Sequence, residues 1–208
     1  APILFATLGA VIAEKAGVCN IGLEGIMMLS ALFGSLCAYW AGSWAAGLLA
    51  ALAVGVLTAL LMGLFAFRLK TDVILVGIAI NMIGSGGTIF LVKAITQLTE
   101  GRAYASTTEL ITQSLQIPNL TIPLIDRIPV VGQIFSGHSL LTYLAFALVF
   151  FTWALLYKTP VGLNLRSVGE NPNAAASVGL SVTRLRFTAI AFSGLMAGFG
   201  GAFMSMSY

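Results

Sequence analysis

Five polar side chains with the chemistry to bind a small molecule interrupt otherwise apolar stretches of the chain. Asn20 and Glu24 lie four residues apart in GVCNIGLEG, a spacing that places both on one face of a helix. Asn81 lies in an uncharged run, with Ser85 and Thr88 at helical spacing after it. Amides, carboxylates and hydroxyls inside a membrane either bond to a neighbouring helix or line a polar cavity. These five residues are therefore the candidate lining of a substrate path.

The sequence leaves two interpretations of each group open. The small and polar stripe around Asn81 is either a helix-packing surface, with the amide bonded to a neighbour, or a cavity wall that bonds a passing substrate. The glycines around Asn20 predict a broken helix, which is either a turn with Glu24 in water or part of the path. Gly194 and Gly198 form a GxxxG pair, which predicts close packing of two helices.

A second polar segment, VGENPNAAASVGLS, carries the signals of a short capped helix. Asn171 followed by Pro172 is typical of a helix start, and Gly179 suits the left-handed position after a helix end. The predicted helix covers residues 172–178. Two turns are not stable alone, so the helix has to dock, either on its own protein or on a soluble partner. Arg166, Arg184 and Arg186 nearby would pair with acids of that partner or anchor to lipid head groups.

Several kinds of chemistry are missing from the sequence. It has no GxxxxGK[ST] phosphate loop, no HExxH motif, and only one His and two Cys. The acids nearest to the apolar stretches, Glu14 and Glu24, do not form a pair suited to acid–base catalysis, and no basic cluster suggests nucleic acid binding. We therefore expect no enzyme activity, no cofactor and no metal. An ion-coupled carrier is disfavoured, because such carriers usually need ionisable residues within their spans.

Composition defines the elements that must position these residues. Of 208 residues, 59% are hydrophobic and 8% are charged, whereas soluble domains carry about 25% charged residues. We expect an all-α, polytopic transmembrane bundle of five or six spans, since each needs about 20 apolar residues. The expected spans are two in residues 26–67 with a turn at 41–44, then 73–92, 139–157 and 187–208, plus a remnant at 2–13.

Loop charges predict the orientation of these spans. One set of loops is rich in basic residues and should be cytoplasmic: Lys15, Arg68, Lys70, Lys158, Arg166, Arg184 and Arg186. Residues 158–186 then form a cytoplasmic loop, and residues 94–138 form an extracytoplasmic loop with a short amphipathic helix near 107–116. Both ends of the chain lie inside apolar runs, so we expect residues 1–208 to be one transmembrane domain that is truncated at both ends.

Two motifs resemble a known family. TPVGLNLRSVGENPNAAASVGLSVTRLR, followed by FSGLMAGFGGAF, resembles the permease subunits of bacterial ABC importers for ribose-like sugars, branched-chain amino acids and nucleosides. EKAGVCNIGLEGIMMLSA is most similar to the nucleoside branch. The resemblance implies that the short helix is a coupling helix that seats in a groove of the ATPase. It assigns this role to Gly169, Asn171, Pro172, Ala174, Ala175 and Gly179.

The resemblance also implies partners and a place in the cell. The expected partners are a separate ABC ATPase, a second and different permease subunit, an extracytoplasmic substrate-binding lipoprotein and the lipid bilayer. The expected location is the bacterial inner membrane, where the chain would import nucleosides by alternating access. A sugar or branched-chain amino acid permease of the same family, and a membrane scaffold without transport activity, remain as alternatives.

Overall fold

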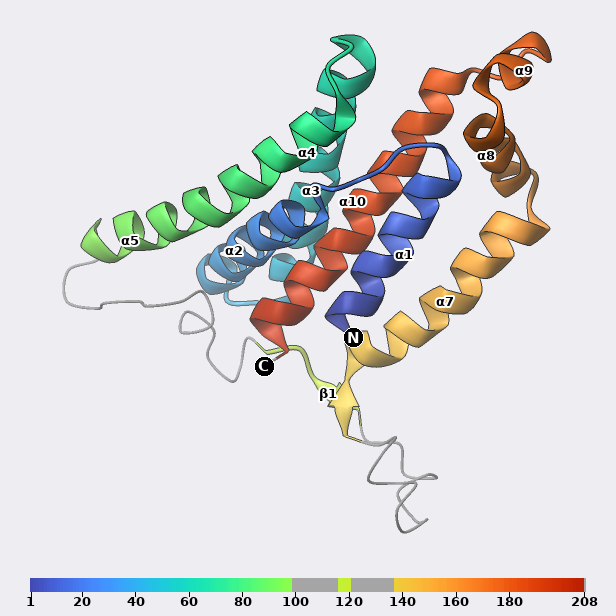
Figure 1. Ribbon diagram of the computed structural model, residues 1–208. Helices are drawn as coiled ribbons and strands as arrows, with labels where there is room; N and C mark the ends of the chain where they lie inside the picture. The colour runs from blue at the N-terminus through green and yellow to red at the C-terminus, as the bar shows by residue number, and fades with distance from the viewer. Residues whose placement is uncertain (99–115, 121–136, 208) are drawn as a thin grey trace, which may run out of the picture.

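The computed structural model describes residues 1–98, 116–120 and 137–207, and these form a bundle of α-helices (Figure 1). Nearly all of the predicted amphipathic helix at 107–116 lies outside the described residues. The helices up to residue 98 are α1 Pro2–Lys15, α2 Leu23–Ala41, α3 Trp44–Gly63, η1 Leu64–Arg68, α4 Val73–Met82, η2 Ile83–Gly87 and α5 Thr88–Leu98. Those after it are α7 Leu140–Lys158, α8 Pro160–Glu170, α9 Pro172–Ser177 and α10 Val182–Met206. A two-residue antiparallel pair, β1 Asn119–Leu120 and β2 His138–Ser139, joins the described parts of the outer loop.

Five helical stretches are long and apolar enough to cross a membrane, and they confirm the all-α polytopic prediction. They are Leu23–Ala41, Trp44–Arg68, Val73–Ile95, Leu140–Lys158 and Val182–Met206. The predicted turn at 41–44 is confirmed, since α2 ends at Gly42 with φ +63° and α3 begins at Trp44. The last span begins at Val182 rather than at residue 187, so Arg184 and Arg186 belong to the helix itself.

α10 is the central helix of the bundle and packs against α1, α2 and α3. In its most apolar stretch 56% of residues are buried, against 28% or less in the spans of α3, α4–α5 and α7. A Cβ on Gly198 would lie 2.9 Å from the Ala51 carbonyl oxygen, and one on Gly55 would lie 3.0 Å from the Gly198 nitrogen. The predicted close packing at the GxxxG pair is confirmed, because only glycine allows this approach.

The basic residues predicted to share one side belong to elements that meet at one end of the bundle, where α1, α7 and η1 end and α10 begins. The N-terminus, the β1–β2 pair and the start of α7 lie at the opposite end (Figure 1). We call the end that carries the basic residues the α8–α9 end. α8 was not predicted from sequence. It is amphipathic, buries Leu165 and Val168, and starts at Thr159, whose hydroxyl accepts from the Gly162 N–H at 3.2 Å.

Candidate functional site

The chain between α1 and α2 confirms the predicted broken helix. α1 ends in a Schellman motif, in which the Val18 N–H donates to the Ala13 carbonyl and the Gly17 N–H to the Glu14 carbonyl, with Gly17 at φ +73°. Residues 18–22 then run back alongside the bundle, and α2 starts at Leu23 (Figure 1). We call residues 17–22 the re-entrant segment.

The start of α2 lies deep in the bundle rather than at its edge. A Cβ on Gly25 would lie 2.7 Å from the Asn81 Cα, so the two backbones touch. Asn81 follows the first residue of α4, Val73, by eight residues, which corresponds to about 12 Å along a helix. The first turn of α2 therefore lies beside the middle of Val73–Ile95, a helical stretch long and apolar enough to cross a membrane.

Asn81 fixes this buried helix start. Its side-chain nitrogen donates to the Ile21 carbonyl at 2.9 Å, and its side-chain oxygen accepts from the Gly25 N–H at 2.7 Å. Gly25 is the third residue of α2, where a backbone N–H has no acceptor within the helix. Asn81 thus caps α2 from a neighbouring helix. Its amide makes the contact expected of a helix-packing surface, the first of the two interpretations left open by the sequence.

Asn20 lies on the re-entrant segment and is 8% exposed. Its side-chain nitrogen donates to the Ser193 hydroxyl of α10 at 2.8 Å. Its side-chain oxygen, Oδ1, is buried and has no hydrogen-bond partner among the described residues. A buried carbonyl oxygen without a hydrogen-bond partner is unfavourable.

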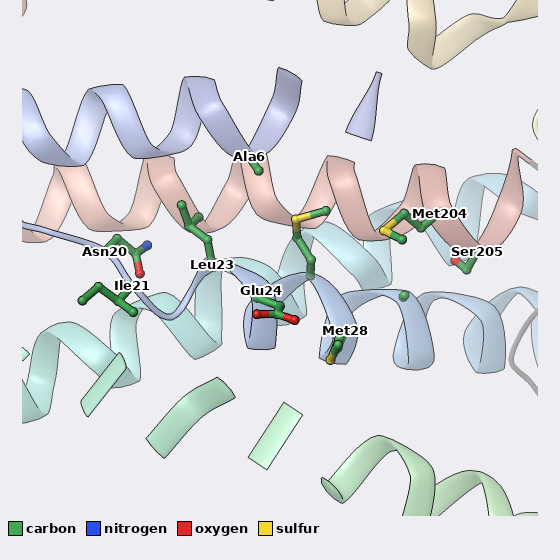
Figure 2. Close-up of a pocket in the computed structure, with 10 residues that line it drawn as sticks. Ala6, Asn20, Ile21, Leu23, Glu24, Met28, Met204 and Ser205 are labelled. Atoms are coloured by element: carbon green, nitrogen blue, oxygen red, sulfur yellow. The ribbon is translucent and has the colours of Figure 1, made fainter. Parts of the chain in front are cut away.

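Asn20 and Glu24 line one cavity of about 660 Å³, a size typical of small-molecule sites. Figure 2 shows Asn20 and Ile21 on the re-entrant segment, Glu24 and Met28 on α2, and Met204 on α10. The full lining is Ala6, Asn20, Ile21, Leu23, Glu24, Met27, Met28, Ala31, Met204 and Ser205. The structure therefore brings two of the five predicted path residues together.

The other three predicted path residues, Asn81, Ser85 and Thr88, are not in this lining. The Ser85 hydroxyl donates to the Met82 carbonyl at 3.3 Å, and the Thr88 hydroxyl to the Gly84 carbonyl at 2.6 Å, so both bond within their own helix. Sequence reasoning missed the three methionines and Ser205. The methionines occur at the helical spacing of ordinary core residues, and a single serine within a span is common. No sequence signal therefore distinguishes these four positions.

The short helix predicted at 172–178 is confirmed as α9 at the α8–α9 end. The Asn171 side-chain oxygen accepts from the N–H groups of Asn173 at 3.1 Å and Ala174 at 3.0 Å, and Gly179 has φ +86°. Ala174 is exposed, and Val178 is 76% exposed.

Two of the six predicted coupling residues face their own chain. Ala175 is 3% exposed, and a Cβ on Gly169 would lie 2.9 Å from the Lys15 carbonyl carbon and 3.1 Å from the Gly17 nitrogen. These two therefore pack against their own chain, whereas Asn171, Ala174 and Gly179 are exposed.

The basic residues near α9 differ in their surroundings. The Arg166 guanidinium stacks over Tyr157 at 4.8 Å, an arrangement that holds the side chain against α7. Arg184 is exposed, whereas Arg186 is half-buried beside Lys70 in a cavity of about 210 Å³. Within residues 1–98, 116–120 and 137–207, no three His, Cys, Asp or Glu side chains come together as a metal site.

Comparison with known proteins gives the class. The model of the family "Branched-chain amino acid transport system / permease component" matches residues 1–208. The chain belongs to this family of membrane permeases.

Particular relatives refine this assignment. The chain is 39% identical to the guanosine ABC transporter permease protein NupQ of Bacillus subtilis, over 97% of the chain and 62% of that protein. It is 35% identical to the nucleoside ABC transporter permease protein NupC of Lactococcus lactis, over 97% and 62%. It is 31% identical to the putative glucose ABC transporter permease protein TsgC13 of Haloferax volcanii, over 99% and 60%. The chain thus spans about three fifths of the length of these relatives, and no solved structure matches it.

Proposed function

We propose that this chain forms the translocation path of a bacterial ABC importer for nucleosides. Two of the most similar relatives carry guanosine or nucleoside in their names, and the family is a permease family. The importer is driven by a separate ATPase, because the chain has no nucleotide-binding loop of its own. A second permease subunit and an extracytoplasmic binding lipoprotein complete it in the inner membrane.

The observation that carries the proposal is the carboxylate of Glu24 in a cavity beside an apolar candidate span. Glu24 is exposed, and it lies on the first turn of α2, whose Gly25 packs against Asn81 of the stretch Val73–Ile95. An acidic side chain facing lipid at the centre of a membrane helix costs about 2.5–3.5 kcal/mol. Such residues therefore face water-filled paths or partner subunits, and a path through the cavity provides that surrounding.

The chemistry of the lining favours a neutral substrate that is rich in hydrogen-bond donors. The cavity offers the two carboxylate oxygens of Glu24 as acceptors, and its lining has no Lys, Arg or His. Ribose hydroxyls and base amino groups would donate to these acceptors, and the thioethers of Met27, Met28 and Met204 suit a flat aromatic base. The carboxylate of a branched-chain amino acid would be repelled by Glu24 without a compensating cation.

The polar loops take the roles that the sequence predicts. Residues 158–186, which hold α8 and α9, form the cytoplasmic loop that contacts the ATPase through Asn171, Pro172, Ala174 and Gly179. Residues 94–138 face the binding protein. In this arrangement the exposed side of α9 is the surface that receives the ATPase, and Arg184 beside it pairs with acidic groups.

Uptake into proteoliposomes that contain the full-length importer tests the proposal. Labelled guanosine should accumulate with ATP inside, whereas labelled leucine and ribose should not. Replacing Glu24 with Ala removes one acceptor worth about 1–3 kcal/mol, so the apparent affinity for guanosine should fall by about 5- to 150-fold. Glu14→Ala, an exposed acid outside the cavity lining, is the matched control and should transport normally. Accumulation of ribose or leucine in place of guanosine would assign the chain to another branch.

A further inference from the structure

The ends of α1 and α8 are in direct backbone contact. A Cβ on Gly17 would lie 3.2 Å from the Gly169 Cα and 3.4 Å from its oxygen, and a Cβ on Gly169 would overlap the Lys15 carbonyl oxygen. The Arg186 guanidinium also lies at this contact, 3.6 Å from the same Cβ position on Gly17. The nearest atoms on both sides belong to the backbone, so a displacement of one stretch bears directly on the other.

α8 and α9 are directly joined. Only Asn171 separates them, and its N–H donates to the Ser167 carbonyl of α8 at 3.0 Å while its side chain caps α9. Gly169 lies two residues before this joint. A force applied to the exposed side of α9 is thus transmitted to the backbone of Gly17.

The path from Gly17 to the cavity is short. Asn20 follows Gly17 by three residues, which span at most about 11 Å when extended. Beyond Asn20, the hydrogen bonds from Asn81 to Ile21 and Gly25 tie the segment to α4. The re-entrant segment is therefore held at one end by α8 and at the other by α4. Asn20, between these two anchors, bonds Ser193 of α10.

We propose that the re-entrant segment is the link through which the α8–α9 unit changes the cavity. Gly169 and Asn81 are positioning residues at its two ends, and neither contacts substrate. Movement of α9 displaces Gly17, and the segment then shifts the Asn20 oxygen and the Glu24 carboxylate relative to Met204 and Ser205 on α10. This inference rests on the proposed function, because it assigns the driving movement to the ATPase.

Cys19 is a natural reporter of this movement, since it is exposed and lies on the re-entrant segment. With Cys37, and any cysteine of the importer outside residues 1–208, replaced by Ser, it is the one thiol available for labelling. The experiment measures the rate at which a small water-soluble methanethiosulfonate reagent labels Cys19 in the full-length importer, without nucleotide and with a non-hydrolysable ATP analogue. We expect the two rates to differ by about tenfold, which corresponds to about 1.4 kcal/mol between the two arrangements.

Gly169→Ala should remove this ATP-dependent difference, because the added methyl group separates α8 from Lys15 and Gly17. Gly86→Ala is the matched control, since a Cβ there meets nothing within 4 Å, and it should retain the difference. Asn81→Leu releases the other anchor, so Cys19 should react rapidly in both nucleotide states. This second variant keeps the test decisive if Gly169→Ala does not fold.

The outcomes separate the link from the transport assignment. Equal Cys19 rates with and without the ATP analogue in an importer that takes up guanosine would refute the link. An unchanged ATP-dependent difference in a folded Gly169→Ala variant would refute it as well. An ATP-dependent difference that Gly169→Ala abolishes would support the link, even in an importer that carries ribose and not guanosine.

Discussion

At the residue scale, the two hydrogen bonds of Asn81 are the most informative contacts in the structure. Replacing Asn81 with Leu leaves the Ile21 carbonyl and the Gly25 N–H without partners. Each lost partner typically costs about 1–3 kcal/mol, so we expect a lower melting temperature in detergent as well as weaker transport. Ser85→Ala is the control, because its hydroxyl bonds only within its own helix. A normal melting temperature in Asn81→Leu would contradict the capping role.

The cap of α9 gives a second prediction at this scale. Asn171→Ala removes the acceptor for two N–H groups and should destabilise α9 by about 1 kcal/mol. Faster amide hydrogen exchange at residues 173–178 would show this loss. Asn171→Asp keeps the acceptor and should retain the protection, so equal exchange in the two variants would contradict the cap.

The two asparagine contacts also differ in what the sequence could predict. The cap at Asn171 bonds two and three residues ahead, so Asn-Pro and the following alanines are enough to predict it. Asn81 bonds residues that lie 56 and 60 positions away. No local sequence pattern extends over so many residues. The sequence could therefore predict that Asn81 needs a partner but not which residue provides it.

At the element scale, α9 has an inner and an outer side with different expected effects. Ala174→Arg adds a long charged side chain on the exposed side, so it should lower co-purification of the ATPase and leave the melting temperature unchanged. Ala175→Arg introduces the same side chain at a buried position and should destabilise the α8–α9 end itself. Normal ATPase co-purification with Ala174→Arg would contradict the proposal that α9 is the coupling surface.

The contact between α3 and α10 gives a fourth prediction. Gly198→Leu places a large side chain where even a Cβ would lie 3.0 Å from the Leu52 Cα. Overpacking of this kind costs about 1–3 kcal/mol, so the melting temperature should fall. Gly86→Leu adds the same side chain in open space and should melt like the unchanged protein. Similar melting of the two variants would contradict close packing at this crossing.

Helices were predictable where apolar length alone defines them. The spans of α2, α3 and α7 follow from uncharged runs and a Gly-Ser turn. α8 was missed because its eleven residues, PVGLNLRSVGE, contain polar residues and two glycines and are typical of a loop. Its stability comes from burying Leu165 and Val168 against the bundle, which is a tertiary effect that periodicity over so short a stretch does not reveal.

At the scale of the whole molecule, the orientation in the membrane is the property to test. In a background without Cys19 and Cys37, a cysteine at His138 should react with an impermeant reagent outside sealed cells, and one at Asn173 should not. Both positions are exposed and lie at opposite ends of the bundle. Labelling only of the cysteine at Asn173 would invert the topology. Permeabilised cells supply the control, because both cysteines should then react.

The central place of α10 determines the order in which the protein can assemble. α10 begins about 120 residues after the end of α3, yet α1, α2 and α3 all pack against it. Synthesis at about 5–20 residues per second leaves these three helices in the membrane for on the order of ten seconds before α10 follows. The small-residue faces around Ala51 and Gly55 have no final partner during that time. Mispairing with other helices therefore occurs mainly while the chain is incomplete. Chaperones and proteases that respond to such mispairing act at this stage, before α10 is in place.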